Sequence, residues 1–118
     1  MLAMRIALVF CALMMALGCS VDPEGDCRSQ CAQQRDEMCN GFTGDENCVS
    51  LCADAETNYD SAVETADRIG CRSQFNSAYD CVFGGDACNT TRCNAQVNEV
   101  QACTVAYCMR NPTDSACM

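Results

Sequence analysis

Cysteine constrains this chain more than any other feature of its sequence. The 118 residues include 14 cysteines but no histidine and no tryptophan. From Cys19 onward, Leu, Ile, Val and Phe supply only 12 of 100 residues, below the roughly 20% at which composition alone predicts disorder. Over the same stretch, 16 acidic residues against 6 arginines give a net charge of −10, which also opposes folding. We therefore expect disulfides, each contributing typically about 2–4 kcal/mol, to hold the fold together.

The first 18 residues have the pattern of an export signal. Arg5 is their only charged residue, and residues 6–17 are apolar throughout. Twelve helical residues span about 18 Å, too little for a bilayer core of about 30 Å. We expect residues 1–18 to be a signal peptide, and export to place the cysteines in an oxidising compartment.

The residues Ala16-Leu17-Gly18-Cys19 resemble the lipobox of bacterial lipoproteins, with alanine where leucine is usual. The resemblance implies that Cys19 is acylated and becomes the mature N-terminus, followed by an acidic tether over residues 19–26. It also implies, through Ser20, an outer-membrane location. Cysteine parity favours lipidation, because loss of Cys11 with the signal leaves 13 cysteines and acylation of Cys19 leaves 12 that can all pair. The alternative is an ordinary signal-peptidase site, which Ala-x-Gly also suits.

The periodicity after the tether is helical, which predicts an all-α fold for residues 27–118. Asp26 is the expected N-cap of a helix over residues 27–39, and Asp45 can cap a second helix. That second helix carries a stripe at alternating spacings of four and three, with two shorter helices as the alternative. The stripe consists of Cys48, Cys52, Ala55, Tyr59, Ala62, Ala66 and Ile69.

Gly70 ends this pattern, and two further helices follow. The third has the stripe Cys71, Phe75, Ala78 and Val82. The fourth is expected over about residues 91–109, stopped by Asn111-Pro112. Its expected buried face consists of Cys93, Val97, Val100, Cys103, Thr104 and Tyr107. The chain thus predicts a small disulfide-rich bundle of about four helices, arranged as two antiparallel hairpins.

The cysteine spacing suggests how the hairpins are cross-linked. Residues that meet across an antiparallel pair have a constant sum of residue numbers, and cysteines four apart share a helix face. This favours the pairs Cys27–Cys52, Cys31–Cys48, Cys71–Cys103 and Cys81–Cys93. An up-down bundle then leaves Cys39–Cys88 at one end and Cys108–Cys117 at the other. Sequence alone does not force this connectivity.

Two groups of proteins share parts of this pattern. Residues 71–103 resemble in spacing the twin C-x9-C hairpin of small mitochondrial intermembrane-space proteins, a likeness that the bacterial signal makes convergent. The whole mature chain resembles cysteine-rich helical lipoproteins of myxobacteria and related bacteria, in its two Cys-x-x-x-Cys steps and in Gly70-Cys71. This second resemblance implies location and fold rather than an activity.

The composition also limits the chemistry. A strongly acidic chain repels nucleic acid, and without histidine or lysine a serine or cysteine nucleophile lacks its usual base. The chain has no Cys-x-x-Cys pair, so thiolate binding of copper or zinc is an alternative to disulfides, not the first expectation. The acidic row Glu56, Asp60, Glu64 and Asp67 is expected to be a solvated helix side.

We expect no catalytic residue, metal or cofactor, but a non-catalytic envelope protein with a membrane anchor and an unknown protein partner. A secreted effector-like scaffold is a further alternative.

Overall fold

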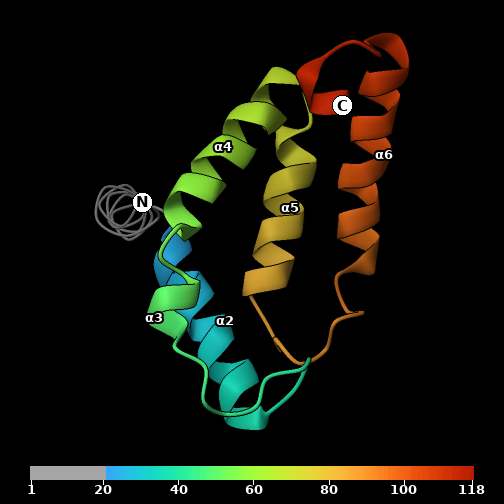
Figure 1. Ribbon diagram of the computed structural model, residues 1–118. Coiled ribbons are helices and arrows are strands. Elements are labelled where there is room, and N and C mark those ends of the chain that lie inside the picture. The colour runs from blue at the N-terminus through green and yellow to red at the C-terminus, as the bar shows by residue number, and fades with distance from the viewer. Residues whose placement is uncertain (1–20) are drawn as a thin grey trace, which may run out of the picture.

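The computed structural model describes residues 21–118, and this part of the chain is all-helical (Figure 1). The signal peptide, the lipobox and Cys19 lie outside the described residues. The elements are α2 (Pro23–Glu37), α3 (Cys48–Leu51), α4 (Ala55–Arg68), α5 (Arg72–Phe83), α6 (Asn94–Arg110) and the short 3₁₀ helix η1 (Ser115–Cys117). Helices α5 and α6 form one antiparallel hairpin. Helix α2 forms the other with α3 and the start of α4, joined to the first at the turn between α4 and α5.

Helix α2 begins four residues earlier than the sequence predicts. The Asp22 side chain, not that of Asp26, caps the helix by accepting a hydrogen bond from the amide of Gly25. Pro23 occupies the first turn, where its missing N–H costs nothing and its fixed φ suits a helix. The residues assigned to a tether, 23–26, are therefore part of the folded domain. The helix also ends earlier, at Glu37, with Met38 in the left-handed region at φ 49°.

The second predicted helix is divided, as the alternative of two shorter helices allowed, but the break lies at residues 52–54 and not at Asn58, where the sequence suggested it and which lies within α4. Asn47, not Asp45, caps α3 by accepting from the amide of Ser50. Between α3 and α4, the amides of Ala53 and Ala55 bond three residues back, to Ser50 and Cys52, so the chain turns more tightly than an α-helix. Gly70 ends α4 at φ 76°, and the Cys71 amide bonds back to the Ala66 carbonyl, which closes the turn into α5.

All twelve cysteines of the described chain form disulfides, with the pairs that the spacing suggests. Cys27–Cys52 and Cys31–Cys48 join α2 to α3, and Cys71–Cys103 and Cys81–Cys93 join the two ends of the α5–α6 hairpin. Cys39–Cys88 and Cys108–Cys117 complete the set. The buried residues are five half-cystines with two alanines and one isoleucine: Cys31, Cys48, Cys52, Cys71, Cys93, Ala66, Ala87 and Ile69. Sulfur therefore replaces most of the aliphatic core of an ordinary domain.

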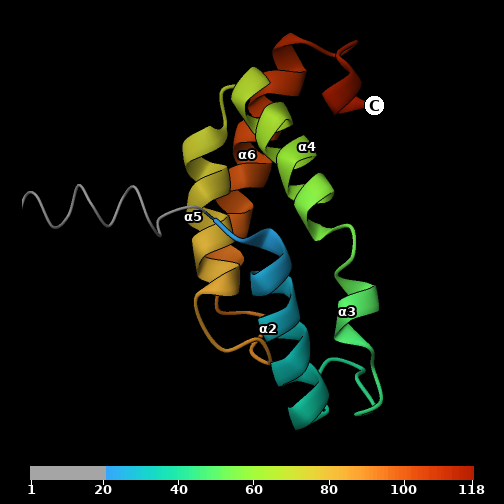
Figure 2. The ribbon, with the colours of Figure 1, turned by 90° about the vertical axis from the view of Figure 1, so that its left-hand side faces the viewer.

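The loop between α5 and α6, residues 84–93, is attached to α2 by amide side chains as well as by Cys39–Cys88. Gln33 donates to Asp86 and accepts from the Ala87 amide, both over 3.0 Å. Gln34 and Asn40 donate to the Ala87 carbonyl over 3.1 and 3.0 Å. Figure 2 shows this loop beside the lower half of α2. These contacts hold the two hairpins together at the end of the molecule opposite the C-terminal tail.

Arg92 organises the same loop from within the second hairpin. Its guanidinium donates to the carbonyls of Cys81 and Val82 at the end of α5 and, through Nε, to the carbonyl of Asp86. The last carbonyls of a helix have no partner within the helix. Arg92 thus supplies the hydrogen bonds that α5 lacks at its C-terminus and fixes the path of the loop.

Candidate functional site: an apolar trough around Phe75

The apolar stripe of α5 is only half covered by the rest of the protein. Phe75, Ala78, Tyr79, Val82 and Phe83 recur at the spacing of one helix face, yet neither α5 nor α6 contains a buried residue between its ends. On α6, Val97 is 46% exposed. The prediction of a buried face was therefore wrong for Val97, which is exposed, and Val100 is only half-buried. Periodicity identifies the apolar side of a helix but does not show whether a neighbour covers it.

Three hollows meet around Phe75, which lines each of them. The first, of about 450 Å³, lies between α5 and α6 and is almost entirely apolar, with Val97, Val100 and Gln101 as its α6 side. The second, of about 350 Å³, lies among α4, α5, α6 and the tail. The third, of about 270 Å³, lies among α2, α4 and α5 and includes Pro23 and Tyr59. We call these three hollows together the trough; its walls are α4 and α6, and α5 lies between them (Figure 1).

Aromatic rings form a continuous group within the trough. The ring centroids of Tyr59 and Tyr79 are 4.9 Å apart, those of Tyr79 and Phe83 are 4.5 Å apart, and Tyr59 lies 5.9 Å from Phe75. The Tyr79 hydroxyl donates to the Asp26 carboxylate over 2.7 Å. Partial burial, and then this hydrogen bond, raise the pKa of Tyr79 well above its ordinary value. The polar end of Tyr79 is thus bound to α2, and its ring contributes to the apolar lining.

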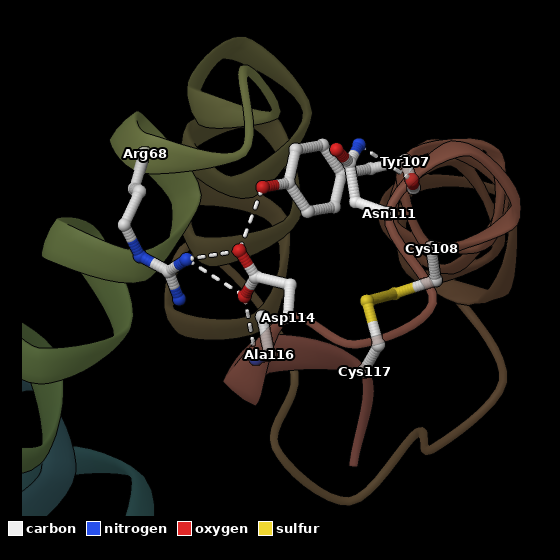
Figure 3. A network of polar contacts seen from close by, with 7 residues as sticks. All are labelled: Arg68, Tyr107, Cys108, Asn111, Asp114, Ala116 and Cys117. Carbon is white, nitrogen blue, oxygen red and sulfur yellow. Dashed lines mark hydrogen bonds and ion pairs between the residues drawn. A yellow bond between two sulfur atoms is a disulfide. The ribbon is translucent and has the colours of Figure 1, made fainter.

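The C-terminal tail is held against α4 and α6 through Asp114, which contacts Arg68 and Tyr107 (Figure 3). Arg68 donates from one nitrogen to both carboxylate oxygens over 2.7 Å, the Tyr107 hydroxyl donates over 2.8 Å, and so does the Ala116 amide. These three donors hold the pKa of Asp114 well below its ordinary value. Together with the Cys108–Cys117 disulfide, they fix η1 so that Ala116 lines the second hollow.

The residues that line the three hollows are all uncharged. Glu56, Asp60 and Glu64 form an exposed row at intervals of four along α4, and at about 100° per residue this row lies roughly opposite the lining face of that helix. Four arginines of the described chain are paired with carboxylates: Arg28 with Glu24, Arg35 with Asp36, Arg68 with Asp114 and Arg72 with Asp67. No arginine lines the three hollows.

The pairing of the cysteines bears directly on the thiolate-metal alternative. Glu37, Cys39 and Cys88 are the group of potential metal ligands that lie close together within residues 21–118. Cys39 and Cys88 are joined in a disulfide, so neither offers a thiolate. The same is true of the Cys27/Cys31 and Cys48/Cys52 steps, whose sulfur atoms bind one another across the hairpin.

Several important residues have no signal in the sequence. The ion pair of Arg68 with Asp114 joins residues 46 apart, and the Tyr79–Asp26 hydrogen bond joins residues 53 apart. Gln33 and Gln34 are polar residues on an exposed-looking helix side, where an amide that binds a loop cannot be told from a solvated one. Spacing indicates the stripe of α5 but not the hollows beside it.

Comparisons with protein-family models, with curated proteins and with solved structures find no match to the chain. Within residues 21–118, no helix combines the length and the apolar character needed to cross a bilayer.

Proposed function

We propose that this protein is a lipid-anchored, non-catalytic protein of the bacterial cell envelope whose role is to bind a partner. The observation that carries the proposal is that all twelve cysteines of the described chain are paired in disulfides. Such pairing requires an oxidising compartment. It also leaves the count of cysteines consistent with a thioether at Cys19, in the lipobox-like sequence Ala16-Leu17-Gly18-Cys19.

The early start of α2 adds a geometric consequence to this proposal. Because α2 begins at Pro23, only Ser20, Val21 and Asp22 separate Cys19 from the folded domain. Four extended steps span at most about 14 Å. A lipid on Cys19 would therefore hold the domain close to the membrane surface and limit the partners it can reach to molecules in or near that membrane.

A binding role also fits the chemistry of the described residues better than catalysis does. The chain has no histidine and no lysine, and its described cysteines are in disulfides, so a serine or threonine nucleophile would lack the imidazole or amine base that usually activates it. The groups with the largest pKa shifts, Asp114 and Tyr79, have structural partners that account for those shifts. The trough, in contrast, is an exposed apolar surface of the kind that marks interaction sites in soluble domains.

The test is acylation and fractionation in cells, with Cys19→Ser and Cys11→Ser as a matched pair. We expect the wild-type chain and Cys11→Ser to incorporate an alkyne-tagged palmitate and to fractionate with membranes, and Cys19→Ser to do neither. The intact mass without reductant should show six disulfides and no alkylated thiol. Release of the wild-type protein without lipid would indicate a secreted scaffold. Alkylation of four or more thiols would favour thiolate metal binding over disulfide formation. Either result overturns the proposal.

A further inference from the structure

The trough has the shape of a helix bundle with one helix missing. Phe75, Ala78, Tyr79, Val82 and Phe83 on α5 occupy positions i, i+3, i+4, i+7 and i+8, which is the apolar face that a helix normally buries against another helix. On α6, Val97, Val100 and Thr104 continue the same surface. On α4, Ala62, Ala66 and Ile69 line its other side. Three helices thus present apolar residues to one space that no described element fills.

The net charge of the domain selects among occupants. The described chain carries 16 acidic residues and 6 arginines, while the residues that line the trough are themselves uncharged. An occupant with positive charge along its outer face would therefore be attracted, and one with negative charge repelled.

We propose that the trough binds an amphipathic helix of a partner protein, with an apolar face that packs on α5 and with Lys or Arg on its flanks. This names the partner class for the interaction role proposed above, and it does not depend on Cys19 or on a lipid. Helix-in-groove recognition uses anchors at the same i, i+3, i+4, i+7 spacing that α5 displays. The apolar face provides the binding surface, and the net negative charge of the domain gives the preference for a basic partner.

Other occupants fit the trough less well. A free fatty acid needs a cation for its carboxylate, and no arginine lines the hollows. An extended peptide gains most of its affinity by joining the edge of a sheet, and residues 21–118 contain no strand. A second copy of this chain would bring a net charge of −10 against an equal negative charge over its described residues.

The absence of tryptophan from the chain allows a selective binding assay. The probe is a synthetic 18-residue helical peptide of Leu and Lys with one Trp on its apolar face, and the control replaces every Lys by Glu. The protein is the full chain carrying Cys19→Ser, recovered from the export compartment, so that detergent does not compete for the trough. We expect saturable binding with a blue shift of the Trp emission, at least tenfold weaker binding of the Glu peptide, and weakening by salt.

Two valines on α6 provide a matched test of where the peptide binds. Val97 lines the trough and is 46% exposed, and Val105 is 51% exposed but lines none of the hollows. Val97→Arg and Val105→Arg add the same charge to the same helix. We expect Val97→Arg to weaken the Lys peptide at least tenfold and Val105→Arg to change it less than twofold. Gln101→Arg, at an exposed lining position, provides a second variant that spares the fold.

Three results would overturn the proposal. Equal losses in the Val97 and Val105 variants would show that the peptide binds only to the general acidic surface. Equal affinity for the Lys and Glu peptides would show that charge does not select the partner. Saturable laurate binding to the protein that Val97→Arg alters and Val105→Arg does not, without peptide binding, would assign the trough to a lipid. None of these results affects the acylation assay, so failure of the anchor and failure of the trough are separate outcomes.

Discussion

Removal of the Cys39–Cys88 disulfide should destabilise the protein more than removal of Cys108–Cys117. Both bonds lie between half-buried cysteines, so changing each pair to alanine loses a similar amount of packing. They differ in the chain they enclose, because Cys39 and Cys88 are 49 residues apart and Cys108 and Cys117 are 9 apart. Cys39–Cys88 is also the one disulfide among residues 21–118 that joins the first hairpin to the second.

The magnitude follows from loop entropy in the unfolded chain. The closed loops contain 50 and 10 residues, one more than each separation. The chain-entropy relation gives about 4.1 kcal/mol for the longer loop and about 2.7 kcal/mol for the shorter one. The expected difference is about 1.4 kcal/mol, or a tenfold change in the unfolding equilibrium constant. The hydrogen bonds of Gln33, Gln34 and Asn40 to loop 84–93 should keep that loop in place in the folded Cys39/Cys88 variant.

The assay is urea unfolding followed by far-ultraviolet circular dichroism, on double alanine variants whose remaining five disulfides are verified by mass. The Cys39→Ala/Cys88→Ala chain should lose more unfolding free energy than the Cys108→Ala/Cys117→Ala chain. If the two losses are equal, or if the second is larger, the enclosed loop does not set the stabilisation. Contacts of the tail, such as those of Asp114, would then outweigh the entropy of the unfolded chain.

Three further predictions concern the core, the tail and the loop. Full reduction should abolish the helical circular dichroism, because five of the eight buried residues are half-cystines; retention of the spectrum would contradict a sulfur core. Asp114→Asn should lower the Tm by a few degrees at pH 6 and by a smaller amount near pH 2. The lowered pKa of Asp114 makes its contribution complete above the ordinary value of 3.8, and that contribution is lost as the pH falls through the lower folded value; a Tm difference independent of pH would refute this. Arg92→Lys should cost about 1–3 kcal/mol in urea unfolding, since lysine cannot reach the carbonyls of Cys81, Val82 and Asp86 together; an unchanged midpoint would show that the loop needs no such donor.

The parts of the fold that sequence could predict are those that local geometry determines. Cysteines four apart must share a helix face, so the pairs at Cys27/Cys31 and Cys48/Cys52 follow from an antiparallel arrangement. The end of α4 at Gly70 follows in the same way, because glycine adopts the left-handed conformation that closes a helix at little cost.

The parts that sequence could not predict depend on contacts between distant residues. The start of α2 was missed because Asp22-Pro23 suits a tether as well as a helix cap, and only the Asp22–Gly25 hydrogen bond distinguishes them. Val97 is exposed and Phe75 only half-buried because no further helix of the described chain packs over this side of α4, α5 and α6. The trough was therefore beyond prediction even though each of its stripes was visible.

The sulfur-rich interior has a consequence for how this surface can evolve. In a domain held by aliphatic packing, rings such as Phe75, Tyr79 and Phe83 are needed inside, and a mutation that alters recognition also threatens the fold. In this protein, covalent bonds between half-cystines stabilise the interior instead. The Phe75 and Phe83 rings can therefore change with the shape of the proposed partner at less cost to the fold, whereas Tyr79 also binds Asp26. Related chains could keep the cysteine pattern while diverging at the two phenylalanines.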